Sequence, residues 1–289
     1  MHIVFFVCAL ASIAAVVLIC LFLFANGIPA MKEIGLLNFL TGAKWKPGND
    51  IYGILPMILG SIYITAGAVV IGVPVGLLTA IYMSRFASPA INRVMLPAVQ
   101  LLAGIPSVVY GFFGMIVLVP AVQAMVKTPF FKTVLHIKSG KGMSLFTAAV
   151  LLGIMILPTI ITVSKTSLDA VPNSYYEGSL ALGATETETY FRVSLPAARS
   201  GVAAAVVLGV GRAIGEAMAI IMVAGNVANM PGLFTSVRFL TTGIISGMAD
   251  AAVGSLYQQA LFSIGLVLFL FIMLINVLLN VCIKRKKED

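Results

Sequence analysis

An arginine and a glutamate interrupt an otherwise uncharged stretch of this sequence. Arg212 and Glu216 lie within the apolar segment 201–224. At a helical rise of about 1.5 Å per residue, Arg212 falls about 17 Å from either end, near the middle of a bilayer. An unpaired arginine there costs about 2.5–3.5 kcal/mol on insertion scales. In a continuous helix the i, i+4 spacing puts both side chains on one face, so the sequence predicts that they pair.

The chemistry that suits this pair is the passage of an anion. A guanidinium offers a planar fork of permanently charged donors, which fits a tetrahedral oxyanion. Glu216 would keep the site near neutral and could accept a hydrogen bond from a protonated phosphate oxygen. Gly209, Gly211 and Gly215 would let adjacent helices approach closely. The alternative is an ion pair that only clamps neighbouring helices.

The composition places the whole chain in a membrane. Of its 289 residues 60% are hydrophobic and 10% charged, and the mean hydropathy is +1.09. Soluble domains carry about 25% charged residues, so lipid must be the main solvent. We therefore expect a single membrane domain over residues 1–289. The net charge of +8 is scattered through loops apart from Lys284–Lys287, which argues against a nucleic-acid partner. His2 and His136 have no neighbouring ligands, so we expect neither a metal site nor a cofactor.

Six segments are long and apolar enough to cross a bilayer, which takes about 20 residues. The sequence thus predicts an all-α, polytopic membrane protein with six transmembrane helices. An even number of spans puts both termini on one side, and the basic tail assigns that side to the cytoplasm. Counted over all loops, the numbers of lysine and arginine residues are nearly balanced, with nine inside, four of them in the tail, against eight outside. The predicted spans are 3–24, 56–83, 97–122, 145–164, 201–224 and 260–282.

The cytoplasmic loop 165–200 carries the signals of two short helices that meet at a bend. Capping boxes of the S/T-x-x-E type mark helix starts, a glycine marks a helix end, and a proline ends the second helix. Read without further context, the pattern is equally typical of surface helices with no special role. The predicted signals are Ser174 with Glu177, Gly183, Thr185 with Glu188, and Pro196.

The spacing in this loop resembles the EAA motif, the coupling loop of permeases of ATP-binding-cassette (ABC) importers. Gly178 and Ser179 replace the two alanines of that motif, and Val193 replaces its isoleucine. In that family the bent helix pair docks into a groove on a cytoplasmic ATPase subunit. The resemblance implies the type I importer fold, with its core at about 56–283, and fixes the loop inside the cell. The residues implied to couple to the ATPase are Glu177, Gly178, Ser179, Gly183, Leu195 and Pro196.

Three further segments resemble the PstC-type subunit of the phosphate permease: 38–47, 104–111 and 211–226. This resemblance implies a phosphate pathway lined by Arg212 and Glu216. Pro106 and Ser107 join them as a break that could expose backbone carbonyls to the pathway, unless they form only a packing kink. Sulfate and molybdate permeases carry a similar Arg-Ala-Leu-Gly-Glu run. Another tetrahedral oxyanion therefore stays open, and sulfate has no proton to donate to Glu216.

Energy for transport must come from another protein, because the sequence has no G-x-x-x-x-G-K-[ST] loop for ATP. The resemblance implies a PstA-like permease partner, a cytoplasmic ATPase dimer and an external phosphate-binding protein, in the lipid of a bacterial inner membrane. An ion-coupled secondary carrier, which would show inverted repeats, is the first alternative. An intramembrane hydrolase would need a nucleophile beside a base. An assembly or sensor protein without transport is the third.

Overall fold

The computed structural model describes residues 1–128 and 142–285, with side chains through residue 278. His136 and the side chains of the basic tail lie outside these residues. The elements, in order, are α1 (His2–Ile34), α2 (Leu36–Thr41), β1 (Trp45–Lys46), η1 (Pro47–Asn49), β2 (Ile51–Tyr52), α3 (Leu55–Ile81), η2 (Tyr82–Phe86), α4 (Pro89–Gly104), α5 (Ser107–Phe113), η3 (Gly114–Leu118), α6 (Val119–Lys127), α8 (Leu145–Asp169), α9 (Asn173–Ala181), α10 (Glu186–Thr189), η4 (Tyr190–Ser194), α11 (Leu195–Ala197), α12 (Arg199–Gly215), α13 (Met218–Val223), α14 (Leu240–Met248) and α15 (Leu256–Arg285).

The all-α, multi-span prediction is confirmed. In the described part of the chain, five helices are long and apolar enough to cross a membrane, and a sixth counts if the bent pair Glu186–Ala197 and Arg199–Gly215 is one span. Two predicted spans differ from the structure. The third begins at Ser107 instead of residue 97, because α4 is a separate helix that ends at Gly104. The fifth is broken after Gly215.

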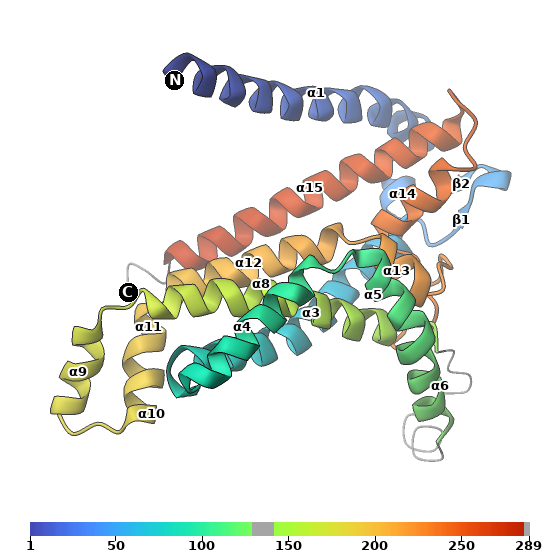
Figure 1. The fold of residues 1–289 in the computed structure, drawn as a ribbon. Coiled ribbons are helices and arrows are strands. Elements are labelled where there is room, and N and C mark those ends of the chain that lie inside the picture. Colours follow the sequence, from blue (N-terminus) through green and yellow to red (C-terminus); the bar gives the residue numbers. More distant parts are fainter. Residues whose placement is uncertain (129–141, 286–289) are drawn as a thin grey trace.

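The core is built around α8, which packs along α3 and α12 (Figure 1). Its window is the most buried of the candidate spans, at 61%. Two glycines of α3 allow the close approach. A Cβ on Gly72 would lie 2.7 Å from the Ile156 side chain, and one on Gly76 would lie 2.8 Å from that of Ile160. Leu151, Leu152, Met155, Ile156 and Ile160 of α8 fill the interior.

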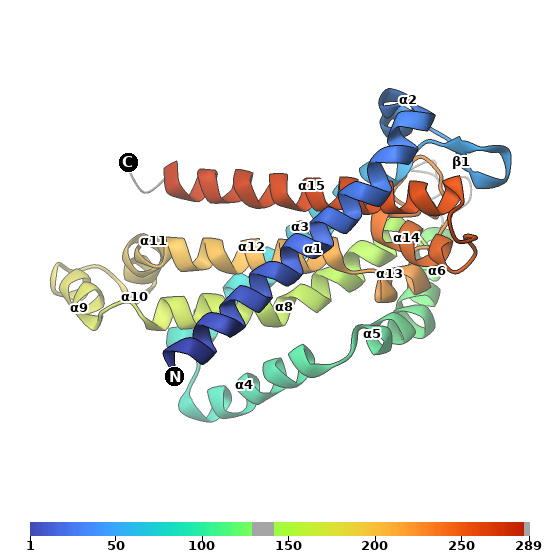
Figure 2. The same ribbon diagram turned by 90° about the horizontal axis from the view of Figure 1, so that it is seen from above.

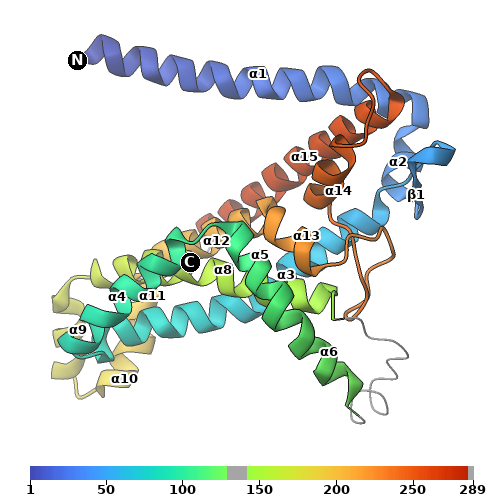
Figure 3. The same cartoon turned by 45° about the vertical axis from the view of Figure 1, so that its right-hand side comes forward.

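Helices α4 and α5 form a separate arm beside this core (Figure 2). The N-terminal helix α1 diverges from the bundle and is held mainly by α15 near its own C-terminal end (Figure 3). There the Ser263 hydroxyl donates to the Gly27 carbonyl at 2.6 Å, and the rings of Phe22 and Phe262 lie 5.3 Å apart. The remaining surface of α1 is apolar and exposed, as lipid contact requires.

The two ends of the molecule differ in structure. Residues 173–197, which we call the elbow, lie at one end, and the antiparallel hairpin of β1 and β2 lies at the other (Figures 1 and 2). The first residues of α1 and the last turns of α15 both lie toward the elbow end. This arrangement agrees with the prediction that both termini lie on one side of the membrane, which stays a prediction.

Candidate functional site

The span that carries Arg212 and Glu216 is broken at Glu216, so Arg212 lies in the helix and Glu216 lies in the break. Helix α12 ends at Gly215, Glu216 is extended with φ −73° and ψ 133°, and α13 starts at Met218. The Glu216 Oε1 atom accepts a hydrogen bond from the Ala219 amide at 3.1 Å. The prediction that a continuous helix pairs the two charges is therefore wrong. Within the described residues the sole ion pair joins Lys165 to Asp169.

The backbone groups at the break are hydrogen bonded by side chains from neighbouring and distant parts of the sequence. A helix start leaves backbone N–H groups without partners, and the Glu216 carboxylate covers one of them. The Thr241 hydroxyl, on the first turn of α14, donates to the Glu216 carbonyl at 2.9 Å. The Leu240 amide donates in turn to the Ser61 hydroxyl of α3 at 3.1 Å. The unwound stretch is thus held from α13, α14 and α3.

Arg212 borders a face of α12 that the described part of the chain leaves uncovered. The opposite face packs on α8 and α3 through its buried residues, Gly209 and Ala213 among them. A Cβ on Gly209 would lie 3.2 Å from Ile160, whereas one on Gly211 or Gly215 would meet nothing within 4 Å. Close helix approach is thus confirmed for Gly209 alone. We call the uncovered stripe the open face of α12; it comprises Ala204, Leu208, Gly211 and Gly215.

The structure brings the segment 104–111 to the same region. The hydroxyl of Tyr110 donates to the Leu102 carbonyl at 2.8 Å across the α4–α5 break, and this phenol lies within electrostatic range of Arg212. A Cβ on Gly111 would lie 2.9 Å from the Ala219 Cα atom, so glycine is required where α5 crosses α13. Two of the three segments that suggested the resemblance therefore converge.

Pro106 and Ser107 occupy the junction between α4 and α5. The Pro106 carbonyl accepts the amides of Val109 and Tyr110 at 3.0 and 3.4 Å, so the first turn of α5 uses it and it is not a free pathway acceptor. Ser107 is half-buried. A groove of about 600 Å³ runs along this junction. Its lining residues are Pro97, Gln100, Leu101, Gly104, Ile105 and Pro106.

The first limb of the elbow ends as the sequence predicts but begins differently. Gly183 has a left-handed φ of 89°, its amide donates to Leu180 at 2.9 Å, and the Ala184 amide donates to Ser179 at 3.3 Å, which is the Schellman arrangement. The predicted cap at Ser174 is wrong. The N-cap is Pro172, two residues earlier, and Ser174 lies inside the helix.

The second limb confirms the other capping box. The Glu188 amide donates to the Thr185 hydroxyl at 3.3 Å, and the Glu188 carboxylate accepts the Thr185 amide at 3.2 Å. The limb ends at Ala197, one residue after Pro196, and the chain then turns by 70° into α12. The hydroxyls of Ser179 and Thr189 are hydrogen bonded at 2.9 Å, which joins the two limbs.

The motif residues of the elbow divide into an exposed set and a packed set. Glu177, Gly178 and Pro196 are exposed, and Leu182 at the tip is 91% exposed. Leu195 is half-buried and packs against the cluster around Tyr190, which is 1% exposed. Of these motif residues only Leu195 is packed, and the exposed set lies at the surface of the elbow.

Arg238, just before α14, is a half-buried charge that the sequence reasoning passed over. Its Nε and Nη2 atoms donate to the Asn226 carbonyl at 3.2 and 3.0 Å, and Nε also donates to the Asn226 Oδ1 atom at 3.0 Å. Asn226 has a left-handed φ of 49°. In the sequence, the Gly225-Asn226 pair is typical of a turn, and this is the feature from which the Asn226 side of the contact could have been predicted.

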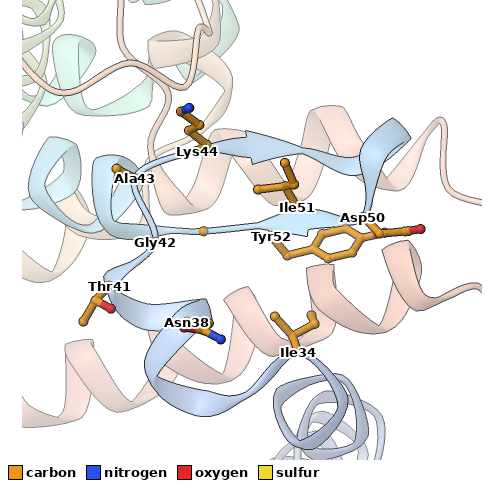
Figure 4. Close-up of a pocket in the computed structure, with 10 residues that line it drawn as sticks. Ile34, Asn38, Thr41, Gly42, Ala43, Lys44, Asp50, Ile51 and Tyr52 are labelled. Atoms are coloured by element: carbon orange, nitrogen blue, oxygen red, sulfur yellow. The ribbon is translucent and has the colours of Figure 1, made fainter.

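A pocket of about 490 Å³ lies at the other end, between α2 and the hairpin (Figure 4). Thr41 lines one side, while Asp50 and Tyr52 lie at the opposite side, where the Tyr52 hydroxyl donates to the Asp50 carboxylate at 3.2 Å. None of the predicted pathway residues lines it. Lys44 and Asp50 both line the pocket, so its formal charges balance.

Comparison with known proteins agrees with this geometry. The model of the family described as "Binding-protein-dependent transport system inner membrane component" matches residues 72–287. The chain is 42% identical over 280 residues to the probable ABC transporter permease protein YqgH of Bacillus subtilis, covering 94% of this chain and 87% of that one. It is 36% identical over 263 residues to the phosphate transport system permease protein PstC of Mesorhizobium japonicum, covering 88% and 80%.

The fold also matches that of a solved structure, an inward-facing form of the MetNI methionine ABC transporter. The TM-score is 0.55 at 19% identity, over 81% of this chain and 94% of that one. At that identity the likeness concerns the fold. Together with the family match, it identifies the chain as a membrane-spanning permease of the binding-protein-dependent ABC importer family.

Proposed function

We propose that this chain is one transmembrane subunit of an importer that moves inorganic phosphate into the cytoplasm. The observation that carries the proposal is the position of Arg212, beside the open face of α12 and three residues before the break in its span. The resemblance to PstC permeases, at 30–36% identity, supports phosphate as the anion. Membership of the importer family decides against the ion-coupled carrier, the hydrolase and the sensor.

The pathway would be completed by a second permease. The glycines of the open face leave space that no side chain of the described part of this chain fills. A PstA-like subunit across that face would enclose an aqueous route. Arg212 would contribute charge to that route, because its guanidinium has no carboxylate partner within the described residues. An anion in a low-dielectric site would interact with it far more strongly than in water.

The elbow would be the contact for the ATPase subunits. Leu182 and the exposed residues around it offer an apolar tip on two short helices that are joined by the Ser179–Thr189 hydrogen bond. On ATP binding, movement of this tip would rock the spans between outward-open and inward-open states. This assignment puts both termini in the cytoplasm, because they share the elbow end (Figure 1). The hairpin end would then face the external phosphate-binding protein.

The alternative function is import of sulfate or molybdate, since any tetrahedral oxyanion can bind a guanidinium. Selection of phosphate through its protonated oxygen would need an acceptor on the Glu216 carboxylate. Of its two oxygens, Oε1 already accepts the Ala219 amide at 3.1 Å. A carboxylate has two oxygens, so Oε2 stays available as an acceptor. Phosphate, which carries a proton near neutral pH, can donate to it, and sulfate cannot.

The test is ATP-dependent uptake in vesicles that contain the assembled complex. We expect the wild type to import phosphate and to be inhibited little by a hundredfold excess of sulfate. Arg212→Ala should lose uptake while the ATPase subunits remain bound, and Arg199→Ala at the exposed start of α12 serves as the control. Unchanged phosphate uptake by Arg212→Ala would refute the pathway role, and preferential sulfate uptake would refute phosphate as the substrate.

A further inference from the structure

Three consecutive residues of η2, the turn that continues α3, contact the end of α8 and two parts of the elbow. The Ser84 hydroxyl donates to Asp169, the last residue of α8, at 2.5 Å. The Arg85 Nη2 atom donates to the Asn173 side chain at the start of α9 at 2.7 Å. The Phe86 ring lies 5.7 Å from the ring of Tyr190 in η4. We call Ser84, Arg85 and Phe86 the clasp.

The shape of the helix end explains how neighbouring residues reach different elements. In a helix, successive side chains are about 100° apart, so three in a row fan over more than half a turn. Here the turn is also widened to a π-helix, in which the Ala87 amide donates to the Tyr82 carbonyl at 2.8 Å. Wide turns of this kind occur often at functional sites. The partner residue Tyr190 begins a second such turn.

Each contact of the clasp is supported by a neighbour. Arg85 also lies over the ring of Tyr176, with its Cζ atom 4.9 Å from the ring centroid. Asp169 is held by the ion pair with Lys165. Tyr190 is 1% exposed and is packed among Ala80, Ile81, Leu168 and Ala198. Arg85 and Phe86 therefore join the elbow by side chains to the end of α3, more than 80 positions earlier in the chain, and Ser84 joins the end of α8.

We propose that the clasp couples the elbow to α3, with Arg85 as the positioning residue that fixes α9. The inference rests on the proposed role of the elbow as the ATPase contact. The backbone alone connects the elbow only to α8 and α12, whereas the clasp adds α3, which packs along α8 through most of the core. Movement of α9 would then displace the three core helices together. Without the Arg85 contacts, α9 could move while α3 stays in place.

The test measures ATP hydrolysis and anion import together in vesicles of the complete complex. We expect Arg85→Gln to lower the anion imported per ATP about tenfold, within the usual range for a coupling between two sites, while the ATPase subunits stay bound. Arg85→Lys keeps the charge over Tyr176 and should restore part of the ratio. Arg93→Gln is the matched control, because Arg93 is exposed on α4 and makes no hydrogen bond or ion pair within the described residues; it should leave the ratio unchanged.

A cycle with Asn173→Ala separates coupling from simple loss of stability. If Arg85 acts through Asn173, the double variant should have the same ratio as Arg85→Gln alone; additive losses would contradict the clasp. An unchanged ratio in Arg85→Gln, or loss of the bound ATPase subunits, would also overturn it. The ratio is taken with whichever anion the wild type imports, so a wrong substrate would defeat the proposed function and leave the clasp testable.

Discussion

Removal of the Glu216 carboxylate distinguishes two arrangements of the fifth span. In the structure this group accepts one hydrogen bond, from the Ala219 amide at 3.1 Å, at the start of α13. Losing a side-chain cap costs about 0.5–2 kcal/mol, and we expect Glu216→Ala to lower the free energy of unfolding by about 1 kcal/mol. If the carboxylate instead paired with Arg212 inside the membrane, the same change would strand a buried charge at about 3–5 kcal/mol.

The measurement is equilibrium unfolding in mixed detergent micelles. Glu216→Gln retains an acceptor oxygen, so a neutral hydrogen bond replaces the charge-assisted one. Because the Ala219 amide keeps a partner, this variant should stay within about 0.5 kcal/mol of the wild type. Glu177→Ala, at an exposed position of α9, controls for the loss of a glutamate and should be near neutral. A loss of 3 kcal/mol or more in Glu216→Ala that Arg212→Gln suppresses would refute the broken-span geometry.

Three further outcomes follow from local geometry. Gly111→Ala should cost about 1–3 kcal/mol of unfolding free energy through contact with the Ala219 backbone, whereas Gly104→Ala, with open space around it, should be neutral. Gly183→Ala should cost about 1–2 kcal/mol because its φ is 89°, and should weaken ATPase binding in co-purification; Gly178→Ala, inside α9, should stabilise by about 0.5–1 kcal/mol. The Thr185 amide and hydroxyl, and then Arg192, lower the pKa of Glu188. Its contribution to stability is therefore complete above the unfolded pKa of about 4.3 and is lost as the pH falls through the lower folded value; Glu188→Gln should abolish that acid sensitivity in a pH titration of unfolding.

The features that the sequence predicted well are those set by nearby residues. Spans follow from runs of apolar residues, which lipid requires wherever the chain crosses. The Thr185 capping box and the helix end at Gly183 depend on groups within about five positions of each other. A left-handed conformation after a helix is readily adopted only by glycine, so this helix end could be predicted from the sequence.

The features that the sequence missed depend on distant partners. The break after Gly215 is held by the Thr241 hydroxyl, 25 residues later, so helical spacing alone extended α12 too far. Helix α9 begins at Asn173 instead of after the predicted cap at Ser174, and the Asn173 side chain accepts a hydrogen bond from Arg85, 88 residues earlier. Burial of Tyr190 likewise requires α3, α8 and α12 together. No local pattern reports such contacts.

We propose that Arg212 borders an aqueous anion route along the open face of α12. The most direct test is the rate at which Gly211→Cys, in a complex otherwise free of cysteine, reacts with membrane-impermeant charged thiol reagents. We expect it to react, faster with an anionic than with a cationic reagent, and to be protected by phosphate, whereas Gly209→Cys, which faces Ile160, should not react. Modification of Gly211→Cys only by lipid-soluble reagents, or by none, would contradict the account.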